Sequence, residues 1–158
     1  MAQQTEQAGT QGQGSLRKTP LNAVHQRMGA KMVEFGGWDM PVRYTGDLEE
    51  HRAVRTAAGL FDLGHMGQLD VSGPDALPFV QAVTTNDVAA LAPGAAQYSL
   101  LPNERGGVID DIIVYRRPAG DGYMVVVNAS NRDKDVGWLR AQRAARPNLD
   151  VAESGAAR

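Results

Sequence analysis

The stretch Gly106-Gly-Val-Ile-Asp-Asp-Ile-Ile-Val-Tyr115 decides how this sequence of 158 residues is interpreted. After the paired glycines, most residues are apolar and β-branched, which favours a strand. Asp110 and Asp111 interrupt that strand, and a buried charge is costly unless it is paired, solvated or used in chemistry. Neighbouring side chains of a strand point to opposite faces of the sheet, so the two acids are not expected to converge on one reacting atom. One is expected to face a pocket and the other a polar rim, a turn or a backbone donor.

Both acids also have a plainer interpretation, in which they mark the start of a strand after a turn, where Asp is common. Tyr98, Asn128 and Met66 have similar alternatives as a strand residue, a helix cap and core filler. The opposite orientation of the two acids disfavours a glycosidase site, where a carboxyl pair must flank one bond. The local pattern therefore leaves structural and functional interpretations open at these residues.

The sequence around this stretch predicts an antiparallel meander. Its strands are expected at residues 97–101, 108–115 and 123–127, with turns at 103–107 and 118–122. Further strands are expected at residues 31–35, 68–71 and 149–151. Residues 38–44 should be extended, and Pro41 should confine that segment to a sheet edge because proline lacks a backbone N–H.

Helices are expected to flank these strands. The first should begin at Thr19-Pro20 and carry Leu21, Val24 and Met28 on one face. The second should begin at Asp47 and end at Gly59, which would serve as a left-handed C-cap. The third should carry Leu77, Phe79, Val80 and Val83, and the fourth should follow the cap residues 128–131 and reach about Ala145. The predicted fold class is α+β, with a largely antiparallel sheet and flanking helices.

Composition sets limits on function. Residues 1–18, rich in Gln and Gly, are expected to form a disordered tail before one partial domain over residues 19–158. A net charge of -2 without a basic stripe argues against nucleic acid, and no apolar run is long enough to span a membrane. The absence of cysteine excludes thiolate chemistry and fits a cytoplasmic location. His25, His51 and His65 lie too far apart for a recognisable metal motif, so no metal is expected, and solvated or core-edge positions are expected for them.

Several segments match one protein family in order and spacing. They are Thr19-Pro-Leu21, Met32-Val-Glu-Phe-Gly-Gly-Trp-Asp-Met-Pro-Val-Arg-Tyr44, Glu50-His-Arg-Ala-Val-Arg55, Gly59-Leu-Phe-Asp-Leu-Gly-His-Met-Gly67, Thr85-Asn-Asp87, Tyr98-Ser99, the stretch quoted above, and Val126-Val-Asn-Ala-Ser-Asn-Arg-Asp-Lys-Asp135. Together they resemble the N-terminal, folate-binding portion of the glycine cleavage system T-protein, an aminomethyltransferase. The resemblance covers nearly everything from Thr19 to Trp138. One departure is Leu63-Gly64, where family members usually have Val-Ser.

The resemblance implies a transferase that takes the aminomethyl group from the lipoyl arm of H-protein, releases ammonia and passes the methylene carbon to tetrahydrofolate. It implies that Asp111 is the catalytic carboxylate and that the folate lies among Met66, Tyr98, Asp110, Val126 and Asn128. T-proteins run to more than twice this length, so the chain is expected to be a truncated folate-binding domain, inactive alone. Two alternatives stay open: a folate-dependent demethylase-type relative and a non-catalytic folate-binding module.

Overall fold

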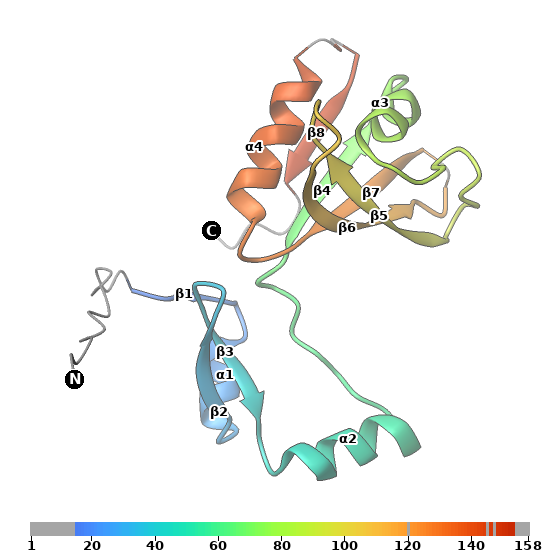
Figure 1. The fold of residues 1–158 in the computed structure, drawn as a ribbon. Helices are drawn as coiled ribbons and strands as arrows, with labels where there is room; N and C mark the ends of the chain where they lie inside the picture. The colour runs from blue at the N-terminus through green and yellow to red at the C-terminus, as the bar shows by residue number, and fades with distance from the viewer. Residues whose placement is uncertain (1–14, 120, 145, 147, 154–158) are drawn as a thin grey trace, which may run out of the picture.

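The computed structural model describes residues 15–119, 121–144, 146 and 148–153, which form two β-sheets and four helices (Figure 1). In chain order the elements are β1 (Arg17–Lys18), α1 (Asn22–Arg27), β2 (Lys31–Phe35), β3 (Trp38–Arg43), α2 (Asp47–Thr56), β4 (Gly67–Ser72), α3 (Ala76–Val83), β5 (Ala96–Pro102), β6 (Val108–Arg116), β7 (Gly122–Val127), α4 (Arg132–Arg143) and β8 (Asp150–Glu153).

The larger sheet contains the predicted meander. Its strands lie in the order β5-β6-β7-β4-β8, and every neighbouring pair is antiparallel. Helices α3 and α4 contact each other and pack on β7 and β4, respectively. Together these elements enclose an apolar core whose fully buried side chains include Leu69, Phe79, Ile112, Val125 and Leu139. The predicted α+β class, with a largely antiparallel sheet, is confirmed.

The smaller sheet has the order β1-β3-β2, and β2 has the predicted bounds. The prediction that Pro41 confines its strand to an edge was wrong, because β3 is the central strand. Strand β1 pairs only with Trp38 and Asp39 of β3, so no hydrogen bond from the backbone of Pro41 to β1 is needed. On the other side, the register between β2 and β3 shifts next to Met32, the partner of Pro41. A short neighbour and an irregular pairing together accommodate the proline.

Strand β1 also corrects the expected extent of the N-terminal tail. Residues 1–14 of that tail lie outside the described residues, but Arg17 and Lys18 pair in parallel with β3. The backbone N–H of Arg17 donates to the Gly37 carbonyl at 3.0 Å, and its guanidinium lies 5.9 Å from the centre of the Trp38 ring. A backbone partner and an aromatic surface therefore order these two residues.

Helix α1 forms where a helix was predicted, but it buries a different face. Leu21, Val24 and Met28 were expected on one face, and two members of that face, Leu21 and Met28, are 46% and 66% exposed. The buried residues of α1 are Asn22 and His25. This helix packs through hydrogen bonds to neighbouring segments, which apolar periodicity does not reveal.

Helix α2 is shorter than predicted, because it ends at Thr56 and Gly59 does not adopt a left-handed conformation. Gly46 is the N-cap and no side chain caps the helix, but the Glu50 carboxylate accepts hydrogen bonds from the backbone N–H groups of Tyr44 and Thr45 at 2.7 and 2.8 Å. No residue of α2 is buried, and the helix projects away from both sheets (Figure 1). Without tertiary packing, little stabilises an additional turn.

Helices α3 and α4 follow the sequence more closely. Phe79, Val80 and Val83 are buried as predicted, whereas Leu77 is 38% exposed. The expected end of α4 at Ala145 lies outside the described residues, and the helix itself ends at Arg143. None of the helices in the described part of the chain has the length and apolar character needed to cross a bilayer.

Two leucines test whether this core carries the stability of the fold. Leu69 is fully buried and Leu60 is fully exposed, at 0% and 100%. Leu69→Ala should lower the free energy of unfolding by about 2–5 kcal/mol, because it removes buried methyl groups and leaves a cavity. The matched control Leu60→Ala should change it by less than about 0.5 kcal/mol. Urea denaturation of both variants measures the difference, and equal losses would contradict the described core.

Candidate functional site

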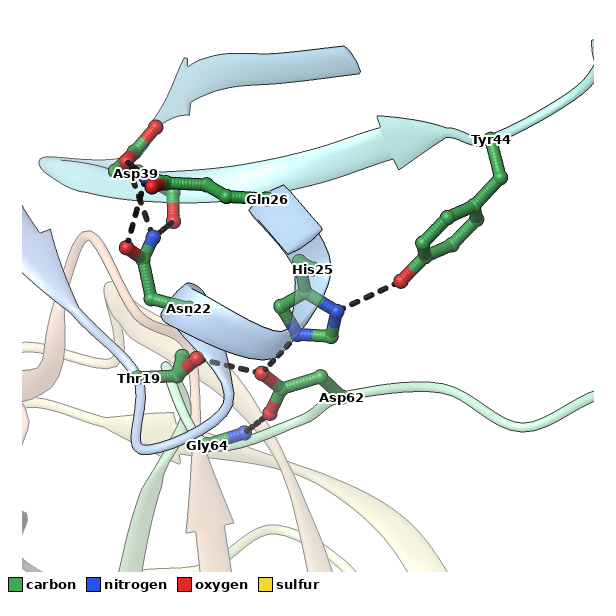
Figure 2. A network of polar contacts seen from close by, with 8 residues as sticks. All are labelled: Thr19, Asn22, His25, Gln26, Asp39, Tyr44, Asp62 and Gly64. Atoms are coloured by element: carbon green, nitrogen blue, oxygen red, sulfur yellow. Dashed lines mark hydrogen bonds and ion pairs between the residues drawn. The ribbon is translucent and has the colours of Figure 1, made fainter. Parts of the chain in front are cut away.

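A polar network fixes the segment that leads into β4 (Figure 2). Asp62 accepts hydrogen bonds from Thr19 Oγ1 at 2.6 Å and from the Gly64 backbone N–H at 2.8 Å, and its carboxylate lies 2.8 Å from His25 Nε2. The other ring nitrogen of His25 lies 2.7 Å from the hydroxyl of Tyr44. The network therefore ties residues 62–64 to the N-terminal sheet and its helix.

The charge of Asp62 depends on these partners. Its side chain is only 6% exposed, and burial alone would raise its pKa. Hydrogen bonds from Thr19, His25 and Gly64 outweigh that effect and hold the pKa of Asp62 below its ordinary value of 3.8. An ionised carboxylate is thus kept in a nearly closed environment.

The histidines do not gather into a metal site. His25 is 6% exposed and contacts Asp62, so it is buried and not solvated. His51 is exposed to solvent. His65 packs edge-on against Phe35, with ring centres 5.7 Å apart, and burial lowers the pKa of His65 despite the nearby Asp62. Among the described residues, no group of three or more His, Asp or Glu side chains is placed to hold a metal ion.

A cavity of about 500 Å³ lies next to this network. Its lining comes from the β2–β3 turn, the segment before β4, the start of β6 and the residues after β7: Phe35, Gly36, His65, Met66, Asp110, Asp111, Asn128, Ala129, Ser130 and Asn131. The volume falls within the range of about 300–1,000 Å³ that is typical of small-molecule sites. Both sheets therefore contribute to one cavity, which has polar and apolar walls.

Asp110 lies on the core side of β6 and is 7% exposed. Its Oδ1 accepts hydrogen bonds from Asn128 Nδ2 at 3.2 Å and from Asn131 Nδ2 at 3.0 Å. Burial would raise the pKa of Asp110, but hydrogen bonds from Asp135, Asn128 and Asn131 outweigh it and lower the pKa below 3.8. Asp110 is accordingly a buried anion held by side-chain donors.

Asp111 points to the other face of the sheet, where Tyr98 and Val126 also lie. The hydroxyl of Tyr98 donates a hydrogen bond to Asp111 Oδ2, and this bond is the main reason why the pKa of Tyr98 is raised. Tyr98 pairs with Ile113 on β6, and Ile113 pairs with Val126 on β7, so the three form a row across this face. Tyr98 is 60% exposed on this face.

Asn128 joins the two acids. Its Nδ2 lies 3.2 Å from Asp110 Oδ1, 3.2 Å from Asp111 Oδ1 and 3.1 Å from the Asp111 carbonyl oxygen. The predicted alternation along the strand is observed, yet both acids line the same cavity. They meet at the end of the strands, where Asn128 follows β7 and its side chain reaches both acids. A strand pattern could not show this, since it describes faces and not strand ends.

The structure brings most of the predicted site residues together. Met66, Asp110, Asp111 and Asn128 line the cavity, and Tyr98 is joined to it through Asp111. Val126 does not line it. Three residues in or next to the site were not predicted as folate-site residues: His65, Asn131 and Asp135. The spacing of Asn128, Asn131 and Asp135 around the start of α4 was the available signal, but residues 128–131 were interpreted as helix caps and Asp135 was given no role.

Comparisons with known proteins identify the family of the chain. The profile of the GCVT N-terminal domain family matches residues 21–156. The chain belongs to this family. Curated relatives in the family include an aminomethyltransferase of Bdellovibrio bacteriovorus, 56% identical over 124 residues, and one of Desulforamulus reducens, 54% identical over 136 residues.

The crystal structure of the glycine cleavage system aminomethyltransferase T from Bartonella henselae has a similar fold. It matches with a TM-score of 0.81 at 39% sequence identity, over 89% of this chain and 39% of that chain. The alignments with the two curated relatives cover 78% and 86% of this chain but only 34% and 36% of theirs. The chain thus spans about a third of the length of these family members.

The network of Figure 2 yields a prediction about stability. Because the pKa of Asp62 is lowered in the folded state, its stabilisation is present above 3.8 and is lost as the pH falls through the folded value. Asp62→Asn should therefore lower the free energy of unfolding by about 1–3 kcal/mol at pH 7 and by less near pH 3.

Urea denaturation across this pH range measures the effect. The matched control is Asp75→Asn at the N-cap of α3, where the side chain makes no capping hydrogen bond. It should leave stability nearly unchanged. An Asp62→Asn loss that is independent of pH would contradict the role assigned to the carboxylate charge.

Proposed function

We propose that this chain forms the tetrahydrofolate-binding portion of an aminomethyltransferase of the glycine cleavage system. The observation that carries the proposal is Asp111, held by Tyr98 and Asn128 at the wall of the cavity, in a chain whose curated relatives are aminomethyltransferases. In this proposal the complete enzyme takes the aminomethyl group from lipoylated H-protein, transfers its carbon to tetrahydrofolate and releases ammonia. The cytoplasmic location expected from the sequence stays a prediction.

The cavity offers suitable chemistry for a reduced folate. Phe35 and His65 supply ring surfaces at one wall, against which a pterin can pack. The carboxylate and amide groups that also line the cavity can pair with the amino and ring N–H groups of such a heterocycle. We assign Met66, Asn128 and Asp110 to this binding wall. Tyr98 and Val126 would meet the folate from the open face of the sheet.

Asp111 has the right properties for the chemical step. Expelling ammonia from an aminomethyl thioether leaves an electron-poor carbon, and a fixed carboxylate stabilises developing positive charge. The same carboxylate can accept a proton as the folate nitrogen attacks. Tyr98 and Asn128 hold Asp111 in place before the substrate arrives, so little reorganisation is needed in the transition state.

A chimaera tests the proposal in a protein of full length. This chain would replace the matching third of the Bdellovibrio bacteriovorus aminomethyltransferase. The chimaera should release ammonia from aminomethylated H-protein when tetrahydrofolate is present. Asp111→Asn in the chimaera should retain folate binding, because the amide keeps the shape of the site. Its turnover should fall by about 10²–10⁴-fold, as when a positioned acid or base is lost.

Asp70→Asn is the matched control, since Asp70 lies in β4 of the same sheet and pairs with Arg117 away from the cavity. It should keep full turnover. A folded chimaera that binds tetrahydrofolate without releasing ammonia would favour a non-catalytic folate-binding module. Near-normal turnover by Asp111→Asn would overturn the catalytic assignment.

A further inference from the structure

Asp135, in the first turn of α4, is the most completely buried acid in the described part of the chain. Its relative exposure is 0%, and neither carboxylate oxygen meets a hydrogen-bond donor among the described residues. A buried carboxylate without a donor is costly, because it loses its hydration and gains nothing in return. Its protonation state therefore needs an explanation.

The explanation lies in its neighbour. The side chains of Asp135 and Asp110 interact, and each changes the pKa of the other. Two ionised carboxylates offer only acceptors, so this contact is a hydrogen bond only when one of them carries a proton. Asp110 already accepts hydrogen bonds from Asn128 and Asn131, which favours its ionised form. The proton accordingly belongs on Asp135.

The charges around Asp135 agree with this assignment. Burial raises the pKa of Asp135 to about 7, helped by the hydrogen bond with Asp110 and by the negative charges of Asp110 and Asp111 on β6. On α4 itself, Lys134 opposes the shift, but its Nζ donates to the Ile109 carbonyl at 2.8 Å instead of pairing with Asp135.

We propose that Asp110 and Asp135 share one proton, and that protonated Asp135 is a positioning residue that holds Asp110 and Asn128 in place behind Asp111. In this arrangement Asp135 donates to Asp110, Asp110 accepts from Asn128, and Asn128 reaches Asp111. When Asp135 loses its proton to solvent, two buried carboxylates face each other and repel. Asn128 then loses the anchor that aims it at Asp111, and the folate site weakens.

The shared proton can be observed in this chain without any ligand. Infrared spectroscopy should show the carbonyl stretch of a protonated carboxylic acid at pH 6, and the band should disappear as the pH rises through about 7. The band should be absent from Asp135→Asn. It should persist in the matched control Asp133→Asn, since the Asp133 side chain is 78% exposed in the same helical turn. A wild-type spectrum without the band would overturn the proposal.

Unfolding gives an independent readout. Because the pKa of Asp135 is raised from 3.8 to about 7 in the folded state, the wild type should lose stability relative to Asp135→Asn as the pH rises across that window. A stability difference that does not change with pH would contradict the shared proton. If Asp135→Asn fails to fold, Asp110→Asn tests the same pair of acids. The new amide can donate a hydrogen bond to ionised Asp135, so the pH at which the infrared band of protonated Asp135 is half lost should fall. An unshifted midpoint would overturn the proposal.

The link to the site rests on the proposed function and is tested by calorimetry with 5-formyltetrahydrofolate, an air-stable reduced folate. Wild-type affinity should fall about tenfold between pH 6 and pH 8.5, the loss expected for one charge-assisted hydrogen bond. Asp135→Asn should bind with little pH dependence, because its amide donates to Asp110 at every pH. A variant profile that falls like the wild type would refute the positioning role. If neither protein binds the folate while the infrared band is present, the proposed function fails and the shared proton stands.

Discussion

The amide of Asn128 is the contact on which the site depends. On strand β6, Asp110 points toward the core and Asp111 toward the other face of the sheet. Asn128 Nδ2 lies 3.2 Å from a carboxylate oxygen of each acid. The buried acid is held by donors, and the partly exposed acid stays available to a ligand. Pairing between β6 and β7 places Asn128 at this point, because Ile112 and Val127 are register partners just before it. The core pairing of the sheet therefore sets the geometry of the site.

The second requirement is that the two sheets meet correctly. Asp62 binds Thr19 and His25, and this fixes the segment that carries His65 and Met66 into the cavity wall. The edge-on contact between Phe35 and His65 also joins the end of β2 to this segment. The ion pair between Arg17 and Asp133 also joins the N-terminal sheet to α4, but both side chains are more than half exposed, so solvent weakens its contribution. Buried polar contacts thus do most of the joining.

The sequence predicted the elements whose signal is local. Alternation and β-branched residues gave the meander and its turns. It failed where tertiary contacts decide. Apolar spacing chose the wrong face of α1 because His25 is buried by its bond to Asp62, and Pro41 sits in a central strand because β1 is too short to reach it. Asp111 was found through family resemblance, whereas Asp135 looks like an ordinary first-turn acid until its burial is known.

The central claim is that a reduced folate binds between the β2–β3 turn and the acids of β6. The most direct measurement is a titration of the isotope-labelled chain with 5-formyltetrahydrofolate, followed through the backbone amide resonances in two-dimensional NMR spectra. Saturable shifts are expected at Met66, Asp111 and Asn128, and the resonances of the exposed helix α2 should stay unchanged. Shifts that are confined to α2, or no saturable shifts at the cavity, would contradict it.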